Sequence, residues 1–205
     1  MTRYNGITSL ISGRLSGLLA LLLVAGCAAP PPLPPRPGVT IAPDLVMVLP
    51  PPSDLGRDVR MDHLVTARYG ERIVSFEGHI EVTGGRFQMA VIDPLGRKAL
   101  TVDWTGDDIA YSAAPWIPDV LQPQNILADL VLIYWPPDVL RRALAPAHAG
   151  LEATPGHRAV VRDGAEIIRI DFFPQDGGVS ARARVSYRNL AFGYSLDIRA
   201  AEPTP

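Results

Sequence analysis

Apolar and polar side chains alternate along five consecutive segments of the chain, at residues 61–69, 72–82, 86–92, 98–104 and 108–112. Period-two alternation is typical of β-strands, because successive side chains point to opposite faces of a sheet. Gly70-Glu71, Gly84-Gly85, Pro94-Leu95-Gly96 and Thr105-Gly106-Asp107 separate these segments and are typical turn sequences. The pattern therefore predicts an up-and-down antiparallel arrangement.

The alternation stops after residue 112, where Pro115, Pro118 and Pro123 punctuate the chain. The segment NILADLVLIYW (125–135) places apolar residues at helical spacing, with Asn125 as the expected N-cap. Pro136-Pro137 should end this helix, and residues 138–144 should form a second, shorter one. Strand patterns return at 157–163, 165–173, 181–189 and 193–200.

About five strands, a helical insertion and about four more strands indicate a mainly β (α+β) fold. One antiparallel sheet with one apolar face needs a cover, and the two central helices are the only segments that could supply it. We therefore expect a single curved antiparallel sheet, a half-barrel, covered by short helices. An apolar cavity is expected wherever sheet and helices do not meet fully.

The N-terminus has the composition of a bacterial lipoprotein signal peptide. Arg3 and Arg14 precede an apolar run from Leu15 to Val24, which is too short to cross a bilayer as a helix. Val24-Ala25-Gly26-Cys27 then resembles the lipobox, in which the cysteine thiol takes up diacylglycerol. The alternative is a buried structural cysteine that follows a signal peptide by chance.

The lipobox interpretation predicts three parts: a signal peptide at 1–26, a lipidated Cys27 with a Pro-rich linker at 27–43, and a folded domain at 44–205. Fatty acyl chains such as palmitate on Cys27 would anchor the chain to a membrane. Ala28 follows Cys27 where an aspartate would favour retention in the inner membrane, by resemblance to enterobacterial sorting rules. We therefore expect a lipid-anchored protein on the periplasmic face of the outer membrane.

Charge and chemistry exclude several function classes. The formal net charge is −2, and removal of residues 1–26 takes away two arginines, so no basic footprint for nucleic acid is present. Cys27 is the only cysteine, and the four histidines at 63, 79, 148 and 157 lack metal-ligand spacing. With no catalytic motif either, we predict a non-enzymatic protein without catalytic residues, metal or cofactor.

The central QPQNILADLVLIYWP (122–136) and the closing LAFGYSLDI (190–198), with the lipobox and linker, resemble a family of uncharacterised bacterial outer-membrane lipoproteins. That family, a domain of unknown function, is similar in architecture to the lipoprotein carriers LolA and LolB, and its genes occur in aryl-polyene clusters. The resemblance covers residues 44–200. It implies a half-barrel whose cavity holds acyl chains, and it supplies no catalytic residue.

Three hypotheses follow. The first is a carrier or acceptor of lipid-like cargo, the second an envelope assembly partner with a fully packed core, and the third a hydrolase of unrecognised type. The segment 114–121, with Trp116 and Ile117, would either touch the bilayer or pack against the domain. The residues expected to line the cavity, each of which could instead fill the core, are Phe76, Phe87, Met89, Trp104, Tyr111, Trp116, Leu130, Trp135, Phe172 and Tyr187.

Overall fold

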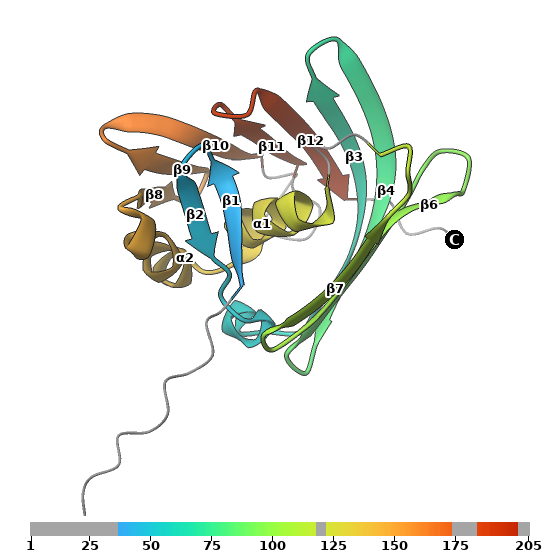
Figure 1. Ribbon diagram of the computed structural model, residues 1–205, viewed down its shortest axis with the longest axis horizontal. Helices are drawn as coiled ribbons and strands as arrows, with labels where there is room; N and C mark the ends of the chain where they lie inside the picture. Colours follow the sequence, from blue (N-terminus) through green and yellow to red (C-terminus); the bar gives the residue numbers. More distant parts are fainter. Residues whose placement is uncertain (1–36, 118–121, 174–183, 201–205) are drawn as a thin grey trace, which may run out of the picture. The chain divides into compact units, whose positions relative to one another are not determined.

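The computed structural model describes residues 37–117, 122–173 and 184–200, all of which belong to the unit Pro35–Pro205 (Figure 1). The signal peptide, Cys27 and most of the predicted linker lie outside the described residues. The strands are β1 Gly38–Ala42, β2 Leu45–Val48, β3 Val59–Tyr69, β4 Arg72–Thr83, β5 Arg86–Ile92, β6 Lys98–Thr105, β7 Asp108–Ala113, β8 Gly150–Thr154, β9 His157–Arg162, β10 Ala165–Phe173, β11 Arg184–Asn189 and β12 Tyr194–Ala200. The helices are α1 Pro123–Tyr134 and α2 Pro137–Leu144, with 3₁₀ turns η1 Pro52–Leu55 and η3 Ala145–Ala147.

Ten of these strands form one antiparallel sheet in the order β7-β6-β5-β4-β3-β12-β11-β10-β9-β8. Strands β3 to β7 and strands β8 to β12 each lie in sequence order, and the two halves join where β3 pairs with β12 in the centre of the sheet. Their register runs from Tyr194 opposite Tyr69 to Ala200 opposite His63. The sheet is not closed, because β7 and β8 are its edges. The prediction of a mainly β fold with one large antiparallel sheet and two short helices is confirmed.

A separate hairpin of β1 and β2 was not predicted, and β1 lies within the range that the sequence assigned to the linker. Its inward side chains are apolar and buried, and they include Ile41 and Leu45. The buried Asn189 side chain donates a hydrogen bond to the Ile41 carbonyl at 2.9 Å and so ties the hairpin to β11. Figure 1 shows the hairpin on the same side of the sheet as α1 and α2.

The core fills the space between one face of the sheet and these covering elements. Phe87 and Trp104 are paired on β5 and β6, and Trp135 follows α1. The Trp104 and Trp135 rings stack at 6.2 Å, and both residues are almost fully buried. The Trp135 indole also donates to the Pro51 carbonyl at 3.2 Å, so its one polar atom has a partner.

Helix α1 begins three residues earlier than predicted. Pro123 occupies its first turn and Gln122 is the N-cap, so the expectation that Asn125 caps the helix is wrong. Proline suits this position because the first helical N–H has no partner within the helix. The Pro136-Pro137 boundary is confirmed, since α1 ends at Tyr134 and α2 starts at Pro137.

The C-terminal end of α1 is capped from the sheet. The Arg158 guanidinium on β9 donates from Nη1 to the carbonyls of Leu132, Ile133 and Trp135, each at 2.9 Å. These carbonyls have no partner within the helix, and their dipoles favour a cation. Arg158 thereby fixes the end of α1 against β9.

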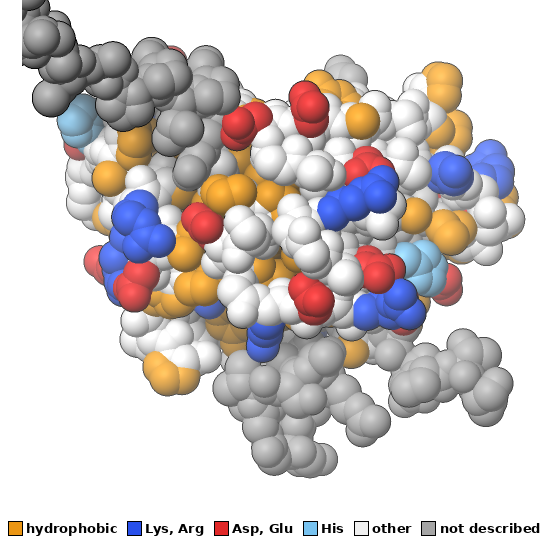
Figure 2. All heavy atoms as spheres, turned by 90° about the horizontal axis from the view of Figure 1, so that it is seen from below, with side chains coloured by type: hydrophobic (Ala, Val, Ile, Leu, Met, Phe, Trp, Pro, Cys, Tyr) orange, Lys and Arg blue, Asp and Glu red, His pale blue; other side chains and the backbone are white. Residues whose placement is uncertain are grey.

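The other face of the sheet carries charged side chains that pair across neighbouring strands, such as Arg60 with Glu81 at 3.0 Å. Figure 2 shows the molecule from below, where side chains of opposite charge lie close together among small groups of hydrophobic ones. Exposed pairs of this kind contribute little stability. They mark the face of the sheet that contacts solvent.

Candidate functional site: an apolar cavity under helix α1

A cavity of about 50 Å³ lies between α1 and the centre of the sheet. Strands β3, β4, β5 and β12 form its floor, and Ile126 and Leu130 of α1 face it from above. The surface that lines it is almost entirely apolar. Its lining residues are His63, Val65, Ala67, Phe76, Gly78, Ile80, Met89, Val91, Ile126, Leu130, Leu196 and Ile198.

Gly78 contributes the open space in the floor of this cavity. It is buried in the middle of β4, between His63 on β3 and Val91 on β5. A Cβ atom built at Gly78 would meet no other heavy atom within 4 Å. Glycine weakens a strand, and it is typical of positions that another molecule or another backbone approaches closely.

One polar side chain lines the cavity, and it belongs to His63. The imidazole is 5 % exposed and stacks on the Tyr134 ring of α1 with a centroid distance of 5.6 Å. Its Nε2 atom is 3.0 Å from the Tyr134 hydroxyl. Burial lowers the pKa of His63 to about 4, against a smaller opposing effect of Asp62. The ring is therefore neutral near pH 7 and can pair with a hydroxyl without placing a charge in the cavity.

A second polar group, on α1, lies beside the cavity. Asp129 precedes the cavity residue Leu130 and is 2 % exposed. The Tyr194 hydroxyl on β12 lies 2.8 and 2.7 Å from its two carboxyl oxygens. Burial raises the pKa of Asp129 to about 7, and the hydroxyls of Tyr187 and Tyr194 limit this rise. Asp129 therefore changes its charge near neutral pH inside an apolar interior.

The ten predicted cavity residues lie in different places. Phe76, Met89 and Leu130 line the cavity. Phe87, Trp104 and Trp135 form the aromatic part of the core, and Tyr187 is buried near Asp129. Phe172 is half-buried under the Arg158 guanidinium, 5.3 Å from its ring centre. Tyr111 and Trp116 are 55 % and 43 % exposed, whereas Ile117, next to Trp116, is buried.

The sequence interpretation missed His63, Gly78 and Asp129 as site residues. In the alternating segment 61–69, His63 shares a face with Met61 and Val65, a pattern that indicates a buried imidazole. Gly78 is a glycine inside an alternating strand, and Asp129 is a lone carboxylate inside an apolar helix. Both patterns are visible in the sequence. Leu127 to Ile133 are all buried in α1, so any charge within that run has to be buried too.

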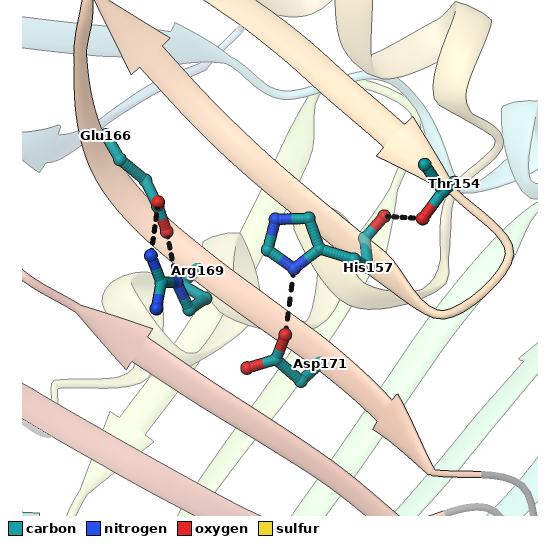
Figure 3. Close-up of polar contacts among 5 residues, drawn as sticks. All are labelled: Thr154, His157, Glu166, Arg169 and Asp171. Carbon is teal, nitrogen blue, oxygen red and sulfur yellow. Dashed lines mark hydrogen bonds and ion pairs between the residues drawn. The ribbon is translucent and has the colours of Figure 1, made fainter.

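A cluster of polar side chains on β9 and β10 contains residue types that occur in catalytic centres (Figure 3). His157 Nδ1 lies 2.8 Å from an Asp171 oxygen, and Arg169 pairs with Glu166. Ser186 on β11 pairs with Asp171, so the acid stands between the histidine and the hydroxyl. In a triad the imidazole must contact the nucleophile, and this order does not provide that contact. Both pairs are polar contacts on the solvent face of the sheet.

Within the described ranges, no group of three His, Cys, Asp or Glu residues is placed to hold a metal ion. None of the described helices has the length and apolar character needed to cross a membrane.

A family model described as "Protein of unknown function (DUF3261)" matches residues 60–202. The comparison with curated proteins found no match.

Proposed function

Because the chain belongs to the DUF3261 family, whose description names no activity, we propose its function from the cavity. The protein is a membrane-anchored periplasmic lipoprotein that binds lipid-like cargo with acyl chains and transfers it at the outer membrane without catalysis. Its sheet and helices act as a half-barrel like those of LolA and LolB, and aryl-polyene lipids or lipoproteins are the cargo classes that the sequence resemblance favours.

The observation that carries this proposal is the open space above Gly78. An empty volume of about 50 Å³ costs roughly 1 kcal/mol of stability, taking about 24 cal/mol per Å³. A single alanine at position 78 would fill part of it without a steric conflict. A binding site for apolar cargo gives a reason for keeping a space that is this easy to fill.

The volume of the cavity limits how much of the cargo can enter it. An engineered apolar cavity of about 150 Å³ holds one benzene molecule, and the space above Gly78 is smaller. It therefore accepts the end of an acyl chain, and a longer part enters only if α1 moves away from β3 and β12. Each buried methylene contributes about 0.8 kcal/mol, so several of them offset the cost of that movement.

Lipid bound to the purified protein tests the proposal. The intact lipoprotein is solubilised in mild detergent, and non-covalent lipid is extracted while the anchor stays attached to Cys27. Mass spectrometry of the extract should identify acyl-chain lipid in stoichiometric amount. Gly78→Val places two methyl groups in the cavity and should reduce the recovered lipid strongly.

Gly150→Val is the matched control. Gly150 is exposed on the edge strand β8, where an added Cβ makes only an ordinary contact at 3.9 Å with the Val161 carbonyl oxygen. This variant should retain the lipid. Equal lipid recovery from wild type, Gly78→Val and Gly150→Val would show that the extracted lipid is not held in the cavity.

The second candidate is an assembly partner of an envelope complex. The small volume of the cavity and the dense core around Trp104 and Trp135 favour it. In that case the intact protein yields no non-covalent lipid but co-purifies with a defined protein at constant stoichiometry, and Gly78→Val leaves that complex unchanged.

A further inference from the structure

The antiparallel sheet has two rims, and their turns differ in chemistry. One rim contains the β3–β4 turn at 70–71, the β5–β6 turn at 93–97 and the segment 114–117 after β7. The opposite rim contains the turns Gly84-Gly85 and Gly106-Asp107, which carry no large apolar side chain. In Figure 1 the β3–β4 turn lies at the top and the β4–β5 turn at the bottom.

Large hydrophobic side chains are exposed on the first rim. Tyr69, Ile73, Leu95 and Trp116 are exposed by 47, 63, 77 and 43 %, and we call these four residues the apolar rim. Ile73, Leu95 and Trp116 line one groove of about 570 Å³. Exposed apolar residues that gather in this way mark an interaction surface.

Cationic side chains surround the apolar rim. Arg72 lies beside Ile73, and Lys98 begins β6 directly after the β5–β6 turn. Arg68 and Arg188 flank Ser195 of β12 on the solvent face below the rim. None of these four makes an ion pair with another residue in the described part of the chain.

The acidic residues near the rim do not neutralise this charge. Asp93 is buried in the β5–β6 turn and is already paired with Arg97 at 2.6 Å. The Arg97 guanidinium also lies 4.9 Å from the centre of the Trp116 ring. Glu71 is the remaining acid in these turns. The surface therefore combines exposed apolar tips with an excess of positive charge.

We propose that the apolar rim docks on the surface of an anionic lipid bilayer. Apolar tips that enter the headgroup region, with arginine and lysine behind them, are the features of surfaces that bind anionic lipids. Trp116 and Tyr69 suit this region because each has an apolar ring and a polar atom. A protein partner would not require Arg68 and Arg188 on the solvent face below the rim. The positive charge of these arginines therefore favours an anionic bilayer.

The docked rim would place the cavity next to the membrane. The Phe76 side chain lines both the groove of the apolar rim and the cavity under α1. Cargo could then pass between bilayer and cavity beside Phe76 without crossing water. This route rests on the proposed function, whereas docking of the rim does not.

Fluorescence of the intact lipoprotein in vesicles tests the docking. The vesicles contain phosphatidylcholine with or without phosphatidylglycerol, and their acyl chains carry bromine, which quenches tryptophan on contact. Trp104 and Trp135 are buried, so quenching should come from Trp116 and be lost in Trp116→Phe. Every sample contains the lipid anchor, so a difference in quenching between two variants does not come from the anchor.

Leu95→Asp and Arg72→Glu should abolish the quenching of Trp116 in vesicles with phosphatidylglycerol. Val46→Asp is the control, because Val46 is 48 % exposed on the β1–β2 hairpin and lies outside the apolar rim. It should be quenched like wild type. Unchanged emission of Trp104 and Trp135 confirms that each variant is folded.

Equal quenching of wild type and Leu95→Asp would overturn the proposal. So would an unquenched Trp116 that is shielded from acrylamide, since a second copy or another protein would then cover the rim. Gly78→Val separates docking from cargo binding, because it should lose lipid cargo and still be quenched. A protein that docks but carries no cargo would refute the proposed function alone.

Discussion

The buried carboxyl group of Asp129 makes the stability of the protein depend on pH in a direction that can be worked out. Its pKa is about 7 in the folded chain and 3.8 when exposed, so the folded state binds more protons between these values. Stability from this group is therefore present below pH 4 and is lost as the pH rises through 7. A shift of about three pKa units corresponds to roughly 4 kcal/mol.

Asp129→Asn removes this charge and keeps an oxygen that accepts from the Tyr194 hydroxyl. Relative to wild type, the variant should gain stability as the pH rises, by up to about 4 kcal/mol between pH 4 and pH 8. Urea unfolding of the chain from residue 28 onward, followed by tryptophan emission, measures the difference. Trp104 and Trp135 are buried and report the loss of the core.

Tyr194→Phe serves as the companion variant. It leaves Asp129 in place but removes a hydroxyl that limits the rise of the aspartate pKa. Its stability should therefore fall more steeply than that of wild type toward high pH. If wild type and Asp129→Asn show parallel pH profiles, Asp129 does not titrate in the folded interior, and the reasoning fails.

Three further predictions use other residues of α1 and the cavity. His63 has a pKa lowered to about 4, so the stability that His63 contributes should fall by up to about 3 kcal/mol as the pH falls from 6.5 to 4. Asp129 acts in the opposite direction over this range, so the quantity to measure is the difference in unfolding free energy between wild type and His63→Gln in the same urea titration, and His63→Gln should gain on wild type by that amount as the pH falls. Arg158→Met keeps the apolar stem but leaves three carbonyls without a donor, so it should lower the free energy of unfolding by about 2–4 kcal/mol. Arg141→Met is the control, because Arg141 forms only an exposed pair with Asp138, and its loss should change stability little. Gly78→Ala should raise stability by about 1 kcal/mol, and a lower melting temperature would show that the space above Gly78 is already occupied.

The strands from β3 to β6 could be predicted because each alternates and ends at a strong turn sequence, and β7 because it follows such a turn. The pairing of β3 with β12 could not, since Tyr69 and Tyr194 are far apart in the chain and periodicity does not select partners. The β1–β2 hairpin was hidden by the prolines on both sides of it. Its turn places Asp44 at a positive φ of 57°, which the sequence did not mark with a glycine.

The candidate site was predicted less well because aromatic residues were expected to face the cavity. Large rings bury the most apolar surface and pack against one another, as Phe87, Trp104 and Trp135 do. A space is left where side chains are small, and so the cavity lies over Gly78 and Ala67. Small residues inside the strands, rather than aromatic residues, therefore indicate where the cavity lies.

The polar contacts of α1 bear on the cargo entry that we propose. Arg158 holds the C-terminal end of the helix, and its cation does not titrate at neutral pH. Asp129 contacts Tyr194 on β12, and Tyr134 contacts His63 on β3. These are the strands that α1 would leave under the proposed function. Ionised Asp129 is more stable in water than in the interior, so a rise of pH through 7 favours separation of the helix from β12 while Arg158 still holds its end. Under the proposed function, α1 would therefore open about the end nearest Arg158.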